Sequence, residues 1–145
     1  MKRILLITLL ATTIGIFTSC NKDEEIKAPE FILFELGYDN SGTAIAGEDL
    51  HMDAEILAEG KIAYVIVTIH PEGEHGYKSI RTIEWEVDTT YTSGYSGVKN
   101  IDFHEHIDIP ADAEVGPYHF HMMVTDMEGN RTEKEAELEI IASEL

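Results

Sequence analysis

Apolar and polar residues alternate along most of the chain after its first 28 residues, and this pattern restricts the folds open to it. Tyr118 and Phe120, for example, flank His119 in one such run. Successive side chains of a β-strand point to opposite faces, so the alternation predicts strands with one buried side. No stretch of this region keeps a helical period. Strands are predicted at residues 31–36, 50–58, 62–70, 80–87, 101–109, 118–125 and 132–141.

The predicted strands are separated by short turn sequences, such as Glu59-Gly60-Lys61. About seven short strands with frequent turns are typical of an antiparallel β-sandwich. A chain of 145 residues with 43% apolar content has room for one core. We therefore predict an all-β chain with one sandwich domain at residues 29–145.

Charge and cysteine content exclude several classes of protein. The 28 acidic residues outnumber the 10 basic ones, which gives a formal net charge of -18. DNA and RNA binding, and an electrostatic grip on an anionic membrane, both depend on basic residues. The single cysteine excludes a disulfide framework and a cysteine-rich zinc site.

Residues 1–19 have the features of a signal peptide. Lys2 and Arg3 supply the positive start, and the apolar run at 4–17 is shorter than the roughly 20 residues of a membrane-spanning helix. The ending Phe17-Thr18-Ser19-Cys20 resembles a bacterial lipoprotein box, which implies cleavage before Cys20 and lipidation of this residue. Lipidation with more than one acyl chain anchors a domain stably to a membrane. The alternative is an ordinary signal with an incidental cysteine.

Residues 20–28 form an acidic tether between the predicted anchor and the domain. Its sequence Asn21-Lys22-Asp23-Glu24-Glu25 resembles the surface-export signal of Bacteroidota lipoproteins, a lysine followed by acids. The resemblance implies an outer-membrane lipoprotein displayed on the cell surface. The alternative is a charged tether with no sorting role.

Two turns around the run at 118–125 sharpen the fold prediction. The segment at 113–118, Ala-Glu-Val-Gly-Pro-Tyr, and the segment at 126–130, Asp-Met-Glu-Gly-Asn, resemble the E–F corner and F–G turn of bacterial immunoglobulin-like domains. Tyr118 occupies the place of a tyrosine corner, in which the hydroxyl bonds back to the backbone. The alternative is an ordinary core tyrosine in another antiparallel sheet.

The chain as a whole resembles a family of short Bacteroidota lipoproteins with one immunoglobulin-like domain of unknown function. The segments that carry the resemblance are 47–51, 69–72 and 116–121, which read Gly-Glu-Asp-Leu-His, Ile-His-Pro-Glu and Gly-Pro-Tyr-His-Phe-His. The resemblance implies an immunoglobulin-like antiparallel sandwich and a surface location. It implies no activity, because a fold does not define a function.

Histidines alternate with apolar residues on several predicted strands. His104 and His106 share one strand face, as do His51 and Asp53. In an immunoglobulin-like sandwich the strands that carry them pair in one sheet, which brings these four residues onto one outer face. Imidazole and carboxylate together bind transition metals such as Zn, Cu, Ni or Fe. We predict a Zn or Cu site here; the alternative is that the polar faces of strands simply contain histidine.

A second histidine set is predicted on the other sheet. His119 and His121 share a strand face, and His70 joins them if Val65, Val67 and Ile69 of its own strand point inward. This set of His70, His119 and His121 is the second candidate for a metal site.

The turn acids offer a different interpretation, a calcium site. Asp39, Asn40, Asp126, Glu128 and Asn130 carry the oxygen ligands that Ca²⁺ prefers, but they form no EF-hand loop. Such residues more often form turns by bonding their own backbone.

Catalysis is not expected, because the sequence contains no Gly-x-Ser-x-Gly elbow and no phosphate-binding loop. The alternative to metal binding is an adhesion or assembly module that binds a protein or glycan partner. Trp85, Tyr91 and Tyr95 lie in or near a predicted exposed loop at 89–100 and are the candidate contacts. Trp85 fits better as a core residue of its own strand. Glu105 breaks the apolar face of its strand and marks a bulge, an edge or an error of register.

Overall fold

The computed structural model describes residues 25–73 and 82–143. The predicted signal peptide at 1–19 and the predicted lipidation site Cys20 lie outside the described residues. Within the described ranges the chain forms eight strands and one short 3-10 segment: β1 (Glu30–Leu36), η1 (Tyr38–Asn40), β2 (Thr43–Ile45), β3 (Asp49–Leu57), β4 (Ile62–Pro71), β5 (Val87–Tyr91), β6 (Asn100–Asp108), β7 (Gly116–Asp126) and β8 (Arg131–Ile141).

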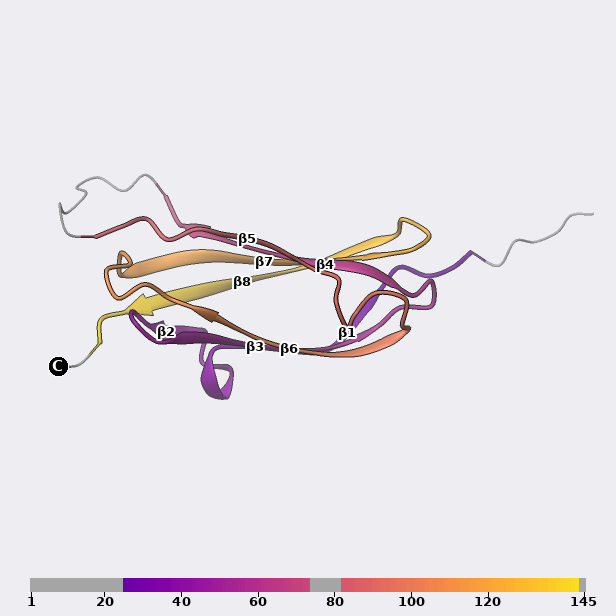
Figure 1. Cartoon of the computed structure of the whole chain (residues 1–145), viewed down its shortest axis with the longest axis horizontal. Helices are drawn as coiled ribbons and strands as arrows, with labels where there is room; N and C mark the ends of the chain where they lie inside the picture. The colour runs from indigo at the N-terminus through magenta and orange to yellow at the C-terminus, as the bar shows by residue number, and fades with distance from the viewer. Residues whose placement is uncertain (1–24, 74–81, 144–145) are drawn as a thin grey trace, which may run out of the picture.

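The strands form two sheets packed face to face. One sheet has the order β1-β3-β6, and the other has the order β2-β8-β7-β4-β5. Figure 1 shows the two layers, with β7 and β8 in one and β3 and β6 in the other. All neighbours pair antiparallel except β2 and β8, which pair parallel. The predicted all-β, immunoglobulin-like sandwich is confirmed.

The core lies between the sheets and is built by the alternation seen in the sequence. Met52 and Ala54 of β3 and Val67, Phe120 and Met122 of the facing sheet are fully buried. Because every second residue points inward, the residues between them face solvent on the two outer faces. The six histidines within the described residues occupy such outward positions on β3, β4, β6 and β7.

Six of the seven predicted strands are present, but the strand predicted at 80–87 is wrong. The strand in this region is β5, and the described residues before it contribute only an isolated bridge between Ile83 and Ala113. Trp85 is 6% exposed and packs edge-on against Tyr118 with ring centroids 6.0 Å apart. Trp85 points into the core although residues 84–86 do not form a strand. The alternation of apolar and polar residues around it therefore predicted a strand wrongly. The predicted loop correspondingly begins only after Tyr91.

The parallel strand β2 was not predicted. It has three residues, Thr43–Ile45, which pair with Glu139, Ile140 and Ile141 of β8. Three residues are too few to show a period, so only the tertiary contact with β8 reveals the strand.

Tyr118 lies near the start of β7, and its ring is buried. Its hydroxyl donates a hydrogen bond to the backbone carbonyl of Glu114 over 2.7 Å. A bond from this position to a carbonyl a few residues upstream is the geometry of a tyrosine corner. Burial raises the pKa of the Tyr118 hydroxyl, so the donor stays protonated.

Described residues of the predicted tether contact two turns of the domain, the one between β7 and β8 and the one between β3 and β4. The side-chain amide of Asn130 donates to the carbonyl of Ile26 over 3.2 Å, and Lys27 lies 3.8 Å from a Glu59 carboxylate oxygen. Across residues 25–73 and 82–143, no helix combines the length and the hydropathy that a membrane crossing requires.

Candidate metal centre

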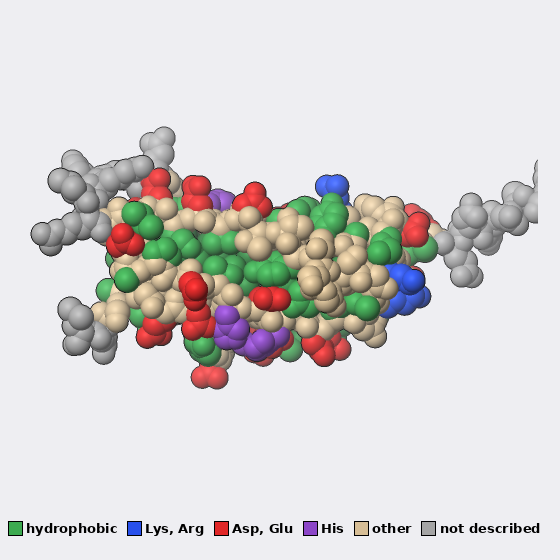
Figure 2. Space-filling view, in the orientation of Figure 1, with side chains coloured by type: hydrophobic (Ala, Val, Ile, Leu, Met, Phe, Trp, Pro, Cys, Tyr) green, Lys and Arg blue, Asp and Glu red, His purple; other side chains and the backbone are tan. Residues whose placement is uncertain are grey.

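The outer face of β3 and β6 brings together the first predicted set of residues. His51 lies directly opposite His106, and Asp53 lies directly opposite His104. Phe103 and Met52, on the same two strands, are fully buried, which fixes the histidines on the outer side. Figure 2 shows histidine side chains gathered on this side of the molecule, with acidic groups around them.

The three imidazole rings form a compact triangle. Their centroids are 4.9 Å apart for His51 and His104, 5.1 Å for His51 and His106, and 5.1 Å for His104 and His106. One ring nitrogen from each residue lies within 4.8 Å of the others. The side chains of His104 and His106 are 56% and 41% exposed, so an ion can reach them from solvent.

Two aspartates orient these rings. Nδ1 of His104 lies 3.1 Å from Oδ2 of Asp53, and Nδ1 of His106 donates to Oδ2 of Asp49. An ionised carboxylate only accepts hydrogen bonds, so each Nδ1 carries the proton and each neutral ring has its lone pair on Nε2. Metal-ligating histidines are commonly held in this way, with a carboxylate on the nitrogen that does not bind the metal.

The two Nε2 atoms face each other. The distance between Nε2 of His104 and Nε2 of His106 is 3.3 Å. Two bare lone pairs at this distance repel each other unless they share a proton or a cation. Two nitrogens bound at roughly 2.0–2.1 Å to one tetrahedral zinc ion lie about 3.3–3.4 Å apart, so the spacing fits a shared metal.

His51 completes the triangle from the neighbouring strand. Its Nδ1 is buried and has no hydrogen-bond partner among the described residues. The ring of Tyr38 stacks on that of His51 with centroids 5.3 Å apart and an interplanar angle of 14°. An unpaired buried polar atom is costly, and a bound ion or its water ligand would satisfy it.

The structure changes the roles expected in this set. Asp53 contacts Nδ1 of His104, which is the ring nitrogen that does not face His106. Asp53 therefore orients the ring of His104 and does not act as a metal ligand itself. Asp49 was missed in the sequence, although it lies two residues before His51 and therefore on the same strand face. The hydrogen bond from His106 is the main reason that the pKa of Asp49 is lowered, and a bond from Tyr38 adds to the effect.

Tyr38 is the second residue that the sequence did not indicate. Its hydroxyl donates to Asp49, with distances of 3.4 and 3.2 Å to the two carboxylate oxygens. Desolvation and this bond raise the pKa of the hydroxyl. Only the turn at η1 brings Tyr38 over β3, and the sequence shows that turn without showing where its side chains point.

The second predicted set shares an outer face but does not converge. His70 lies opposite His119, and the ring of His70 stacks on that of His121 with centroids 5.5 Å apart. Nδ1 of His70 donates to the carbonyl of Pro71 over 3.2 Å, while Nε2 of His119 lies 3.8 Å from Glu72. His121 points instead toward carboxylates of β8. The three rings therefore interact with three different partners.

In each turn one side chain accepts from nearby backbone N–H groups, and in the first turn Oδ1 of Asn40 accepts from the N–H of Leu36 over 3.1 Å. Asp39 and Asn40 take left-handed conformations, with φ of 55° and 54°. Oδ1 of the buried Asp126 accepts from the backbone N–H groups of Glu128 and Asn130 over 3.0 and 2.8 Å. These contacts support the interpretation of both segments as turns.

The aromatic residues of the predicted partner surface are packed into the fold. Tyr91 and Tyr95 each lie 5.1 Å from the ring of Phe103. The hydroxyl of Tyr95 donates to Glu105 over 2.6 Å, and burial together with this bond raises its pKa to about 12. Glu105 lies on the edge strand β6 and pairs in regular register with Met52 of β3. The glutamate that interrupts the apolar face of this strand therefore marks an edge of the sheet.

The fold and this face define a class, an immunoglobulin-like β-sandwich with a histidine triad on one outer face. The chain belongs to a domain family, the domain of unknown function DUF4625, whose model matches residues 18–141. Among curated proteins, none matches this sequence.

Solved structures similar to this chain share its fold. One is a Niemann-Pick type C2 protein from Japanese carpenter ant, with a TM-score of 0.51 and 11% identity over 83% of this chain and 98% of that one. Another is a DUF4466 family protein from Parabacteroides merdae, with a TM-score of 0.51 and 15% identity over 78% of this chain and 45% of that one. At these identities the likeness concerns the fold alone.

Proposed function

We propose that this chain is a non-catalytic binding protein that holds one transition metal ion, Zn or Cu, at His51, His104 and His106. The observation that carries the proposal is the pair of Nε2 atoms facing each other at 3.3 Å while both Nδ1 atoms are held by aspartates. Three imidazoles from two strands leave the solvent side of the ion open. The open side can accept water or a ligand carried by the metal.

The proposal includes a location. Cleavage before Cys20 and lipidation of this residue place the domain on the outer membrane, with residues 21–28 as its tether and the cell surface as its site of display. Metabolic labelling with a fatty acid tests the anchor: label is expected on the natural chain and not on Cys20→Ser. Proteinase treatment of intact cells tests surface display, and full protection of the domain would contradict it.

Metal analysis tests the site. All described strands lie between residues 30 and 141, so a chain that starts at residue 21 contains every described strand. This chain, made without a histidine tag, is incubated with mixed Zn, Cu and Ni and then desalted. The double variant His104→Ala, His106→Ala is expected to retain one equivalent less than the natural sequence.

The matched control is His70→Ala with His119→Ala, which also removes two outward-facing imidazoles that are only half-buried. It is expected to retain as much metal as the natural sequence. Equal retention by both double variants would overturn the metal site, and a protein or glycan partner would then be the function to pursue.

A further inference from the structure

The outer face of the five-stranded sheet carries a row of carboxylates beside a pair of histidines. On β8 the side chains of Glu133, Glu135, Glu137 and Glu139 share one face, and the residues between them on the opposite face are Lys134, Ala136 and Leu138. β7 runs alongside, with His121 opposite Glu135 and His119 opposite Glu137. Like charges this close repel one another, so a cation on this face has a favourable environment.

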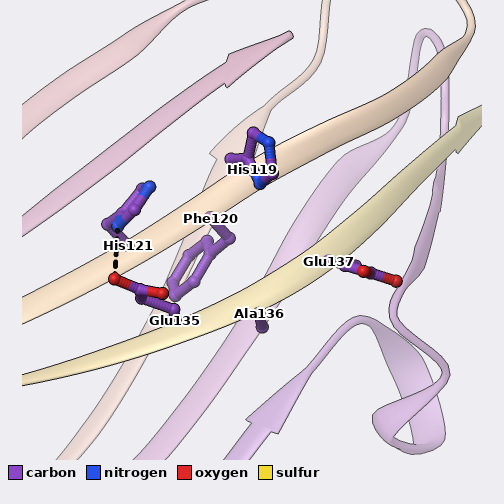
Figure 3. A pocket seen from close by; sticks show the side chains of 6 residues that line it. All are labelled: His119, Phe120, His121, Glu135, Ala136 and Glu137. Carbon is purple, nitrogen blue, oxygen red and sulfur yellow. Dashed lines mark ion pairs between the residues drawn. The ribbon is translucent and has the colours of Figure 1, made fainter. Parts of the chain in front are cut away.

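Three of these side chains converge. Nδ1 of His121 lies 3.0 Å from Oε1 of Glu133 and 3.9 Å from Oε1 of Glu135. One ligand atom from each residue lies within 4.8 Å of the others. Figure 3 shows His121 directed at Glu135, while His119 and Glu137 lie farther along the strands. Nε2 of His119 lies 3.8 Å from Oε1 of Glu72 instead. His121 is therefore the histidine of the converging group.

A depression of the surface includes His121 and Glu135, and Glu133 lies outside its lining. The depression, of about 490 Å³, is lined by His119, Phe120, His121, Glu135, Ala136 and Glu137. The side chains of His121 and Glu135 are 29% and 73% exposed, so the imidazole is partly enclosed while the carboxylate can move toward an ion.

We propose a second cation site at His121, Glu133 and Glu135, separate from the histidine triad and independent of it. One nitrogen and two carboxylates form a harder ligand set than three imidazoles, and such sets suit Mn²⁺. The two carboxylates balance the charge of a divalent ion. The metal-binding form of His121 is the neutral ring with its lone pair on Nδ1 and its one proton on Nε2, so the proton moves between the two ring nitrogens when the ion binds.

Manganese alone is the probe, because it favours this ligand set over the triad. The chain from residue 21 is titrated with Mn²⁺, and the free ion is followed by its electron paramagnetic resonance signal. One equivalent is expected to bind. Glu133→Gln with Glu135→Gln, and separately His121→Ala, are each expected to weaken this binding at least tenfold.

The matched control is Glu137→Gln with Glu139→Gln, which removes the same charge from the same face of the same strand. Binding within threefold of the natural sequence is expected for this control. Equal weakening of both glutamate variants would overturn the site and indicate diffuse attraction to an acidic surface. Unchanged binding in Glu133→Gln with Glu135→Gln would overturn it as well.

A further variant separates this proposal from the histidine triad. His104→Ala with His106→Ala is expected to bind Mn²⁺ as the natural sequence does. Loss of Mn²⁺ in this variant would assign the ion to the triad and overturn the second site, whatever the outcome of the zinc and copper experiment.

Discussion

Two outer faces of this sandwich carry the same histidine pattern in different arrangements. On each face one histidine lies directly across from a member of a His-x-His pair: His51 opposite His106, and His70 opposite His119. The ring centroids are 4.9–5.1 Å apart on the β3–β6 face. They are 5.4–6.4 Å apart on the β4–β7 face. A shared pattern along the strands therefore does not produce a shared geometry.

The neighbouring strands explain the difference. β6 is an edge strand, so within the sheet only β3 flanks its histidines, and β3 supplies Asp49 and Asp53. These aspartates hold the two Nδ1 atoms and so turn the Nε2 atoms toward each other. β7 lies between β4 and β8, and the glutamates of β8 draw His121 away from the other rings. Carboxylates beside a pair of histidines can therefore turn the rings toward a common point, as on β3 and β6, or hold them apart, as on β7 and β8.

The largest expected effect comes from removing the cross-strand histidine of the β3–β6 face, compared with the same change on the β4–β7 face. His51→Ala is expected to weaken Zn²⁺ binding about 100-fold, because a structural zinc ion gains roughly 3 kcal/mol from each of its four ligands. His70→Ala, at the equivalent place on the other face, is expected to leave zinc affinity within twofold. Competition with a chromogenic chelator measures both, and equal losses would contradict the contrast between the faces.

The orienting aspartates come next. Asp49→Asn and Asp53→Asn are each expected to weaken Zn²⁺ binding roughly 10- to 100-fold, the usual effect of losing a carboxylate that positions a histidine ligand. Glu72→Gln, which removes the carboxylate beside His119, serves as the control. Calorimetric titration measures the affinities. A loss in Glu72→Gln as large as in Asp49→Asn would show a general charge effect instead.

The inner side of β6 gives a smaller effect that separates folding from binding. Tyr95→Phe is expected to lower the free energy of unfolding by about 1 kcal/mol, through loss of the bond to Glu105, and to leave zinc affinity unchanged. The pKa of Tyr95 is raised from 10.0 to about 12 in the folded state. Its stabilising contribution is therefore complete below pH 10 and is lost as the pH rises toward 12.

Chemical denaturation at pH 7 and pH 11 measures this contribution. The natural chain is expected to lose more stability between the two pH values than Tyr95→Phe does. An equal loss of unfolding free energy in both proteins would mean that Tyr95 does not account for the loss of stability at alkaline pH.

The smallest expected effect is a change in the free energy of unfolding when Glu137 and Glu139, which have no ion pair with a histidine among the described residues, lose their charge. Glu137→Gln with Glu139→Gln is expected to raise the free energy of unfolding by a few tenths of a kcal/mol, since it relieves repulsion along β8. Asp49→Asn is expected to lower it, since Asp49 accepts bonds from His106 and Tyr38. Thermal unfolding at low salt shows both, and the gain on β8 should vanish in 1 M salt, where charges are screened beyond about 3 Å.

The alternation of the sequence was sufficient for the fold class and for the outward side of His51, His104, His106, His119 and His121, while it left the side of His70 open. The alternation was not sufficient in two regions: one where apolar residues alternate outside a strand, and one where the strand is too short to show any alternation. Trp85 points into the core from an irregular segment, so its spacing predicted a strand that the chain does not form. The three residues of β2 are recognisable only through their pairing with β8.

The sequence by itself determined which residues share a face, because side-chain direction in a strand depends only on position along the chain. It therefore placed His51 beside Asp53 and His104 beside His106, and the strand pairing of an immunoglobulin-like sandwich was needed to bring the two pairs onto one surface. Only the tertiary structure decided which nitrogen each ring presents and to what, because that depends on the carboxylates that adjoining strands supply. Asp49 on β3 and Glu133 on β8 have this role in the two clusters, and each became visible only when its strand was set beside a histidine pair.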